Sequence, residues 1–172
     1  MLKVNIKNNP RGFTLLELLL YITLMGILVL AASSFITMTF SAKIKNKTIS
    51  EVEQQGEIIA YLISQSIKNS SGLNSPTTGN NASSLSLSSG DILQNPIIFS
   101  LVGGNIMVSY VGGANINLNN NFVTASNLIF YNLSYPGTSG NLKAQFTLSA
   151  TDSYGRSEYI YSKNFSVTAS KR

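Results

Sequence analysis

Histidine, cysteine and tryptophan are absent from this 172-residue chain, and the first two absences exclude whole classes of chemistry. Without histidine there is no imidazole base, no histidine-ligated metal and no serine–histidine nucleophile. Without cysteine there is no disulfide framework, no thiol catalysis, no cysteine metal site and no lipoprotein processing. We therefore predict that the chain is not an enzyme, and we predict neither a catalytic residue nor a cofactor nor a metal.

Acidic residues are also scarce, because the chain has seven in all and residues 72–172 hold three of them, Asp91, Asp152 and Glu158. Asp152 and Glu158 flank a Tyr154-Gly155 turn, which would let their carboxylates approach each other. We interpret the two as a solvated hairpin tip rather than a catalytic carboxylate pair. Calcium bound by these carboxylates and backbone carbonyls is the alternative, although no dense ligand loop accompanies them.

The chain does have a long apolar segment, residues 13–42, which contains one charged side chain, Glu17. About 20 apolar residues are enough to cross a bilayer. The thirteen Leu, Ile, Val and Phe residues between 13 and 35 favour insertion by about −4 to −8 kcal/mol, against roughly +2.5 to +3.5 kcal/mol for one acid at the helix centre. We predict a membrane span in which Glu17 has a function, since ionisable residues in a span are costly.

Three features coincide at the start of the apolar segment. A glycine immediately precedes it, an aromatic residue opens it, and a glutamate follows at its fifth position; these are Gly12, Phe13 and Glu17. The preceding leader is basic and carries Lys3, Lys7 and Arg11. Together they resemble the class III signal of type IV prepilins and type II secretion pseudopilins.

The resemblance implies a role for each of these residues. A prepilin peptidase would cut between Gly12 and Phe13 and methylate the new amino terminus. Glu17 would pair with the terminal amine of Phe13 in a neighbouring subunit, and a buried carboxylate is tolerable when a cation pairs with it. Processing is therefore assigned to Gly12 and Phe13, and assembly to Phe13 and Glu17.

Two other readings of the N-terminal region stay open. An ordinary secretory signal peptide would explain the basic leader, and Ala31-Ala32-Ser33-Ser34 offers small residues for cleavage. Its apolar run would be unusually long, however, and Glu17 would have no use. A plain single-pass anchor would explain the length of the segment but neither Gly12 nor Glu17.

The resemblance also implies partners and a location. The chain would be a structural subunit held in the cytoplasmic membrane, with its N-terminus inside and its C-terminal domain outside, before it enters a helical fibre. Its partners would be the prepilin peptidase, other pilins or pseudopilins, and an inner-membrane assembly platform. The machine is left open between a type IV pilus, a type II secretion pseudopilus and a competence pilus.

Several features resemble minor (J-type) pseudopilins and minor pilins more than major pilins. These are the missing cysteines, Ser34 where major pilins often carry proline, the helix glutamines and a late strand; the residues are Gln54, Gln55, Gln65 and Leu128-Ile129-Phe130-Tyr131. An adhesion or DNA-binding subunit on the same anchor is the alternative. Removal of the leader lowers the net charge from +5 to +2, which gives little support to nucleic-acid binding. The candidate basic groove would use Lys143, Arg156, Lys163, Lys171 and Arg172.

The organisation we predict is α+β and pilin-like, with a long N-terminal helix packed on a C-terminal antiparallel sheet domain. Its segments are a leader (1–12), a membrane or fibre-core helix (13–42), an amphipathic continuation (43–71), a polar linker (72–82) and a β-rich domain (83–172). Val52, Ile59, Ile63 and Ile67 recur near helical spacing in the continuation. No proline interrupts residues 13–70, and Gly72 suits a left-handed helix cap.

In the last half of the chain the hydrophobic period changes to two. Residues 97–102 and 106–111 flank Gly103-Gly104-Asn105, which predicts a hairpin. Further strands are predicted over 128–135, 142–150 and 159–167. Strict alternation from Leu142 to Ala150 indicates a sheet with one buried face. Lys163 breaks the last alternation and is predicted to be a solvated edge position, while the asparagine run 117–121 is predicted to be a loop.

Overall fold

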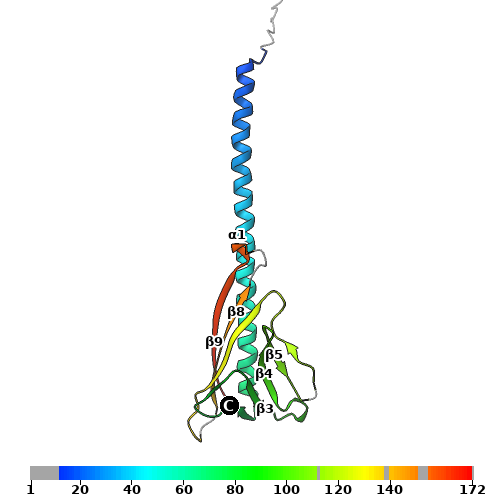
Figure 1. Cartoon of the computed structure of the whole chain (residues 1–172), viewed down its shortest axis with the longest axis vertical. Coiled ribbons are helices and arrows are strands. Elements are labelled where there is room, and N and C mark those ends of the chain that lie inside the picture. Colours follow the sequence, from blue (N-terminus) through cyan, green and yellow to red (C-terminus); the bar gives the residue numbers. More distant parts are fainter. Residues whose placement is uncertain (1–11, 112, 138–139, 151–154, 172) are drawn as a thin grey trace, which may run out of the picture. The chain divides into compact units, whose positions relative to one another are not determined.

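A computed structural model describes residues 12–111, 113–137, 140–150 and 155–171. The chain divides into two compact units, Met1–Ala42 and Lys43–Arg172, which we call the N-terminal and C-terminal units. Helix α1 (Leu15–Asn69) supplies residues to both of them. Figure 1 labels this helix and several of the strands that follow it.

In the N-terminal unit, α1 exposes large apolar side chains around its whole circumference. Within the described part of the chain, α1 is the one helix that is long and apolar enough to cross a membrane, judged by length and composition. Its hydroxyl groups donate hydrogen bonds of 2.8–3.0 Å to carbonyl oxygens three or four residues earlier; they belong to Thr23, Ser34, Thr37 and Thr39. These four hydroxyl groups are therefore satisfied by the helix itself.

The part of α1 in the C-terminal unit is amphipathic. Its buried residues recur every three or four positions and are Thr48, Val52, Gly56, Ile59, Ile63 and Ile67. This spacing places them on one face of the helix. The amphipathic continuation predicted from the apolar periodicity is confirmed.

The strands of the C-terminal unit form two separate antiparallel sheets. The first sheet has the order β1 (Gly72–Ser75), β3 (Leu85–Ser88), β4 (Ile97–Val102), β5 (Asn105–Ser109) and β6 (Ile116–Asn117). The second has the order β2 (Asn81–Ala82), β7 (Thr124–Asn132), β8 (Asn141–Ala150) and β9 (Tyr161–Ser170). Two short 3₁₀ turns, η1 (Ile92–Gln94) and η2 (Ser157–Tyr159), precede β4 and β9.

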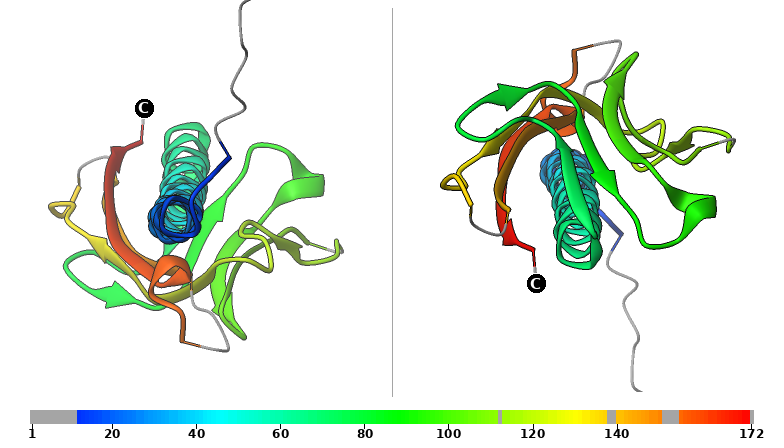
Figure 2. Two further views of the ribbon diagram at one scale, coloured as in Figure 1. Left: turned by 90° about the horizontal axis from the view of Figure 1, so that it is seen from above. Right: turned by 90° about the horizontal axis from the view of Figure 1, so that it is seen from below.

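Both sheets pack against residues 43–69 of α1, and Figure 2 shows them curving around this part of the helix from two sides. Strand β8 buries every second residue toward the core, namely Leu142, Ala144, Phe146, Leu148 and Ala150. These side chains and the buried face of α1 belong to one hydrophobic cluster. The predicted α+β, pilin-like architecture and the one-sided burial of this strand are confirmed.

The predicted hairpin is also confirmed, because β4 and β5 pair antiparallel across a two-residue turn. The turn residues Gly103 and Gly104 have φ angles of 57° and 80°. Residues that carry a side chain rarely adopt a positive φ, so glycine at both positions matches a two-residue hairpin turn.

Residues 72–82 differ from the polar linker that the sequence predicted, since they contain β1 and β2. Gly72 does not form a left-handed cap but begins β1, and Ser71 donates its N–H to the Ser88 carbonyl at 2.8 Å. Asn74 bonds to the hydroxyls of Ser86 and Ser88 across the ladder. Polar side chains hold this edge pairing together, so no hydrophobic alternation signals it in the sequence.

Two predicted strands are displaced along the chain by a few residues: β7 covers Thr124–Asn132 instead of 128–135, and β9 covers Tyr161–Ser170 instead of 159–167. Strand β7 begins at Thr124 rather than near 128, and its register with β8 shifts between Ser126 and Ile129. Asn127 lies in this irregularity with a φ of 53°. A bulge of this kind interrupts the alternation of inward and outward residues, which hides the true start of the strand.

Candidate processing and assembly site

The residues assigned to processing lie immediately before α1. Phe13 is exposed, and no atom beyond the adjacent residues lies within 4 Å of the position that a Cβ on Gly12 would occupy. Gly12 and Phe13 precede the first helical residue, Leu15. The peptide bond between them therefore lies in an open stretch of chain just outside the helix.

Thr14 caps the start of α1. Its Oγ1 accepts the backbone N–H of Glu17 at 3.2 Å, and its carbonyl oxygen accepts the N–H of Leu18 at 3.1 Å. A threonine followed three residues later by glutamate is the sequence pattern of a capping box. The cap fixes the point at which the helix begins and places Glu17 in its first turn.

The carboxylate of Glu17 has a partner inside the same helix. The phenolic O–H of Tyr21 donates to Glu17 Oε1 at 3.1 Å, from one helical turn further along. The Tyr21 ring in turn meets the Phe13 ring edge to face, with centroids 6.0 Å apart and an interplanar angle of 71°. Tyr21 therefore links both residues assigned to assembly.

Tyr21 did not emerge from the sequence as a site residue. The signal that would have found it is its spacing, because residues four apart on a helix face each other. A phenol at position i+4 from the one carboxylate in an apolar segment is a hydrogen-bond donor of suitable length. Helical spacing alone therefore pairs Glu17 with Tyr21.

The leader charges Lys3, Lys7 and Arg11 lie outside the described residues. Asp152 does too, so the interpretation of Asp152 and Glu158 as a solvated hairpin tip stays a prediction. Asp91 caps η1 by accepting the N–H of Leu93 at 3.0 Å. In the stretches of chain that the structure describes, no three acidic side chains gather where they could hold a metal ion.

Lys163 lies at a sheet edge and is partly solvated, as predicted, but it also makes an ion pair that the sequence did not indicate. From the edge strand β9, its ammonium group binds Glu53 of α1 at 2.7 Å, and the Tyr161 hydroxyl contacts the same carboxylate oxygen at 3.4 Å. The hydrogen bond from Lys163, and then its charge, lower the pKa of Glu53. The hydrogen bond to Glu53 raises the pKa of Lys163 despite partial desolvation. This pair links the outer strand to the helix.

Among the basic residues considered for a nucleic-acid groove, Arg172 lies outside the described residues, and the described lysines do not share one surface. Lys143 of β8 faces away from the core side of its sheet, whereas Lys163 is the ladder partner of buried Leu148 and faces the helix. Lys171 binds the carbonyl oxygen of Ser71. Cross-strand neighbours share a face of a sheet, so Lys143 and Lys163 lie on opposite faces.

The asparagine run connects the first sheet to α1. The side chain of buried Asn119 accepts from the Ile106 N–H at 2.8 Å and donates to the Val123 carbonyl at 2.7 Å. Asn120 donates from Nδ2 to Glu51 at 2.8 Å and from its backbone N–H to Gln55 at 3.1 Å. Asn117 belongs to β6 and not to the predicted loop, whereas residues 118–121 form the loop as predicted, and side-chain hydrogen bonds hold it in place.

Comparison with known protein families identifies the start of the chain. A profile described as "Prokaryotic N-terminal methylation motif" matches residues 7–33. The chain thus carries a prepilin-type motif at its start, and this motif in general implies prepilin peptidase processing and pilus assembly. Searches of curated proteins and of solved structures find no significant match.

Proposed function

We propose that this chain is a minor structural subunit of a type IV pilus, a type II secretion pseudopilus or a competence pilus. In this proposal prepilin peptidase cleaves between Gly12 and Phe13, and methylates Phe13. The mature subunit lies in the cytoplasmic membrane through residues 13–42, with its C-terminal unit outside. It then enters a fibre through its N-terminal helix.

The observation that carries the proposal is Glu17, the single charge in the apolar segment, placed five positions into the chain that would begin at Phe13. Its Oε1 is bound by one donor, Tyr21, which leaves the carboxylate with capacity for another. A terminal amine from a neighbouring subunit is a cation of suitable size. Such a pair would offset the cost of placing each charge in an apolar fibre core.

Minor status is favoured by features of the helix and by composition. The chain has no cysteine, and Ser34 continues α1 where major pilins often carry proline. The Ser34 hydroxyl bonds to the Leu30 carbonyl within the helix. These features support a subunit present in small numbers, while the choice among the three machines depends on which assembly proteins accompany it.

The substitution Glu17→Leu tests the proposal by separating assembly from insertion. Removal of the charge favours insertion, and cleavage after Gly12 persists because Gly12 and the basic leader are unchanged. Fibre incorporation fails, because an unpaired buried charge typically costs about 3–5 kcal/mol, equivalent to a loss of a few hundredfold or more. Mass spectrometry of the mature chain checks for N-methylated Phe13, and shearing separates fibre-bound from membrane-bound material.

Glu57→Leu is the matched control, because Glu57 is an exposed glutamate of the same helix in the C-terminal unit. This variant retains processing and incorporation. Normal fibre incorporation of processed Glu17→Leu protein would show that Glu17 is not the assembly residue. A mature protein beginning near Ser34 would replace the whole proposal with an ordinary signal peptide.

A further inference from the structure

Three lysines begin the C-terminal unit, immediately after the apolar segment. Lys43, Lys45 and Lys47 follow Ala42, and the next charged residue on α1 is Glu51. At 100° per residue, Lys43 and Lys47 share one face of the helix and Lys45 lies on the opposite face. Positive charge therefore surrounds the helix where the apolar sequence ends.

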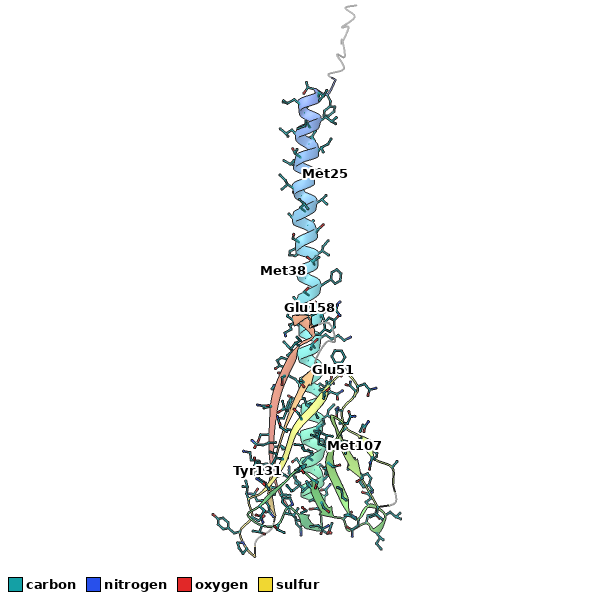
Figure 3. All side chains as sticks on the ribbon, in the orientation of Figure 1. Met25, Met38, Glu51, Met107, Tyr131 and Glu158 are labelled. Atoms are coloured by element: carbon teal, nitrogen blue, oxygen red, sulfur yellow. The ribbon has the colours of Figure 1, made fainter. Side chains whose placement is uncertain are left out.

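Lys45 also holds a turn of the sheet against the helix at this level. Its ammonium group donates to the carbonyl oxygens of Ser157 at 3.0 Å and Ile160 at 2.5 Å. Ser157 begins η2, the turn that leads into β9, and Ile160 directly follows it. Figure 3 shows Glu158 of this turn beside α1. Two hydrogen bonds from Lys45 thus hold η2 against α1, two residues after the C-terminal unit begins at Lys43.

The composition of η2 is typical of a membrane interface. The guanidinium of Arg156 lies 4.4 Å from the centroid of the Tyr159 ring, and the side chain of Ile160 is 44% exposed. Tyrosine and basic residues are enriched where proteins meet lipid headgroups, because their apolar bodies and polar tips suit that boundary. Glu158 is the one acid within this turn.

We infer that Lys43, Lys45, Lys47, Arg156, Tyr159 and Ile160 form a collar that docks the C-terminal unit on anionic phospholipid headgroups. Each basic side chain near an anionic membrane surface contributes roughly a factor of five to binding. An acidic protein would contact one side of the helix, whereas the collar presents charge on opposite sides. A planar anionic surface crossed by the helix meets both sides at once, which favours lipid over a protein partner.

The inference requires residues 13–42 to lie in a bilayer but requires no fibre, so it goes beyond the proposed function and its test is separate. The full chain is placed in nanodiscs of phosphatidylcholine alone or with phosphatidylglycerol. The chain has no tryptophan, so Tyr159→Trp provides a single fluorophore within the collar. Its quenching by brominated acyl chains reports the docked state.

Quenching is expected to rise with the phosphatidylglycerol fraction and to fall with salt, because the attraction is electrostatic. Lys43→Gln with Lys47→Gln lowers the ratio of docked to undocked protein by about thirtyfold, which is the factor for two basic residues. Lys68→Gln with Lys143→Gln removes the same net charge elsewhere in the C-terminal unit and leaves quenching unchanged. Circular dichroism verifies that both pairs are folded.

Three results would overturn the inference. Equal quenching in neutral and anionic discs would exclude recognition of the headgroups. An equal loss in the Lys68 and Lys143 control would mean that total charge matters and the collar does not. Quenching that requires two chains in each disc would assign the collar to a second copy of the protein instead of the lipid.

Discussion

At the scale of single residues, Glu17 provides a negative charge, and its contact with Tyr21 fixes the direction in which the carboxylate points. The Tyr21 hydroxyl donates to Glu17 Oε1 at 3.1 Å, while its ring contacts Phe13. Because χ angles of a long acid are free in the absence of a partner, this bond restricts where the carboxylate points. A neighbouring amine would then meet an acceptor that is already positioned.

Tyr21→Phe keeps the ring and removes the hydroxyl, so we expect insertion and processing to be unchanged. The yield of assembled fibre should fall by about tenfold or more, since a hydrogen bond to a charged group contributes roughly 1.5–3 kcal/mol. The ratio of sheared to membrane-bound protein measures this effect. Tyr61→Phe, at an exposed position of the same helix, should assemble normally; unchanged assembly of Tyr21→Phe would show that the hydroxyl has no part in it.

The ion pair between Lys163 and Glu53 makes a pH-dependent contribution to stability. The pKa of Glu53 is lowered from 4.5 and that of Lys163 is raised from 10.5. The contribution is therefore complete between these two ordinary values. It is lost as the pH falls through the lowered pKa of Glu53, and as the pH rises through the raised pKa of Lys163.

Lys163→Met should consequently lower the melting temperature by a constant amount from about pH 5 to pH 10, with a difference that vanishes in stronger acid. The effect is small because both side chains are 40% exposed to solvent. Thermal unfolding of the full chain in detergent, followed by circular dichroism, measures it. Lys143→Met, on the other face of the sheet, provides the comparison. A deficit that persists below pH 3 would assign the effect to packing of the lysine stem.

At the scale of secondary-structure elements, Gly56 determines how closely β9 approaches α1. A Cβ at this position would lie 2.1 Å from Phe165 Cζ, so the ring packs directly on the helix backbone. Phe165 also stacks on Phe146 of β8, with centroids 5.3 Å apart. Gly56 is therefore a contact point between α1 and the outer strand β9.

Gly56→Ala should destabilise the C-terminal unit by about 1–3 kcal/mol, because the displaced ring must leave its place in a packed core. The melting temperature of the full chain should fall by several degrees. Gly26→Ala is the matched control, since no atom beyond its own stretch of helix lies within 4 Å of its Cβ position; better helix propensity makes it neutral or stabilising. Adding Phe165→Leu should recover part of the loss, and no loss in Gly56→Ala would refute the close packing.

Regular hydrophobic periods explain which elements the sequence could predict. The buried stripe of α1, the β4–β5 hairpin and the alternation of β8 were all visible, because apolar residues mark each of them. Strands β1 and β2 were not visible, since their short pairings depend on backbone bonds and on polar side chains such as Asn74. The division of the strands into two sheets results from long-range pairing, which no local pattern encodes.

For the candidate site too, the sequence could indicate local patterns but not contacts between side chains that are far apart in the chain. Gly12, Phe13 and Glu17 were recognisable from their order in the chain. Their roles in processing and assembly stay a proposal that experiments on both steps test. Tyr21 and the Lys45 contact to η2 depend on how side chains meet in space. Lys45 and Ser157 are 112 residues apart in sequence, so nothing in the local sequence pairs them.

At the scale of the whole molecule, the hydrophobic cluster lies within the C-terminal unit, from Val52 to Ala169. The side chains of α1 in the N-terminal unit contribute nothing to it. Deletion of residues 1–42 should therefore leave a soluble, folded protein rich in β-structure. Circular dichroism and dispersed proton NMR signals would verify this, and an unfolded product would contradict the architecture.

The internal hydrogen bonds of four hydroxyl groups bear on the proposed transfer of the subunit from the membrane to a fibre; the residues are Thr23, Ser34, Thr37 and Thr39. Each is satisfied by a carbonyl of its own helix, so none requires a new partner when the surroundings change. Exchange of lipid tails for the side chains of other helices would then be nearly neutral in free energy for most of this segment. Under the proposed function, the difference in free energy between membrane and fibre would then be concentrated at Glu17, so a single carboxylate would decide whether the subunit stays in the membrane or enters the fibre.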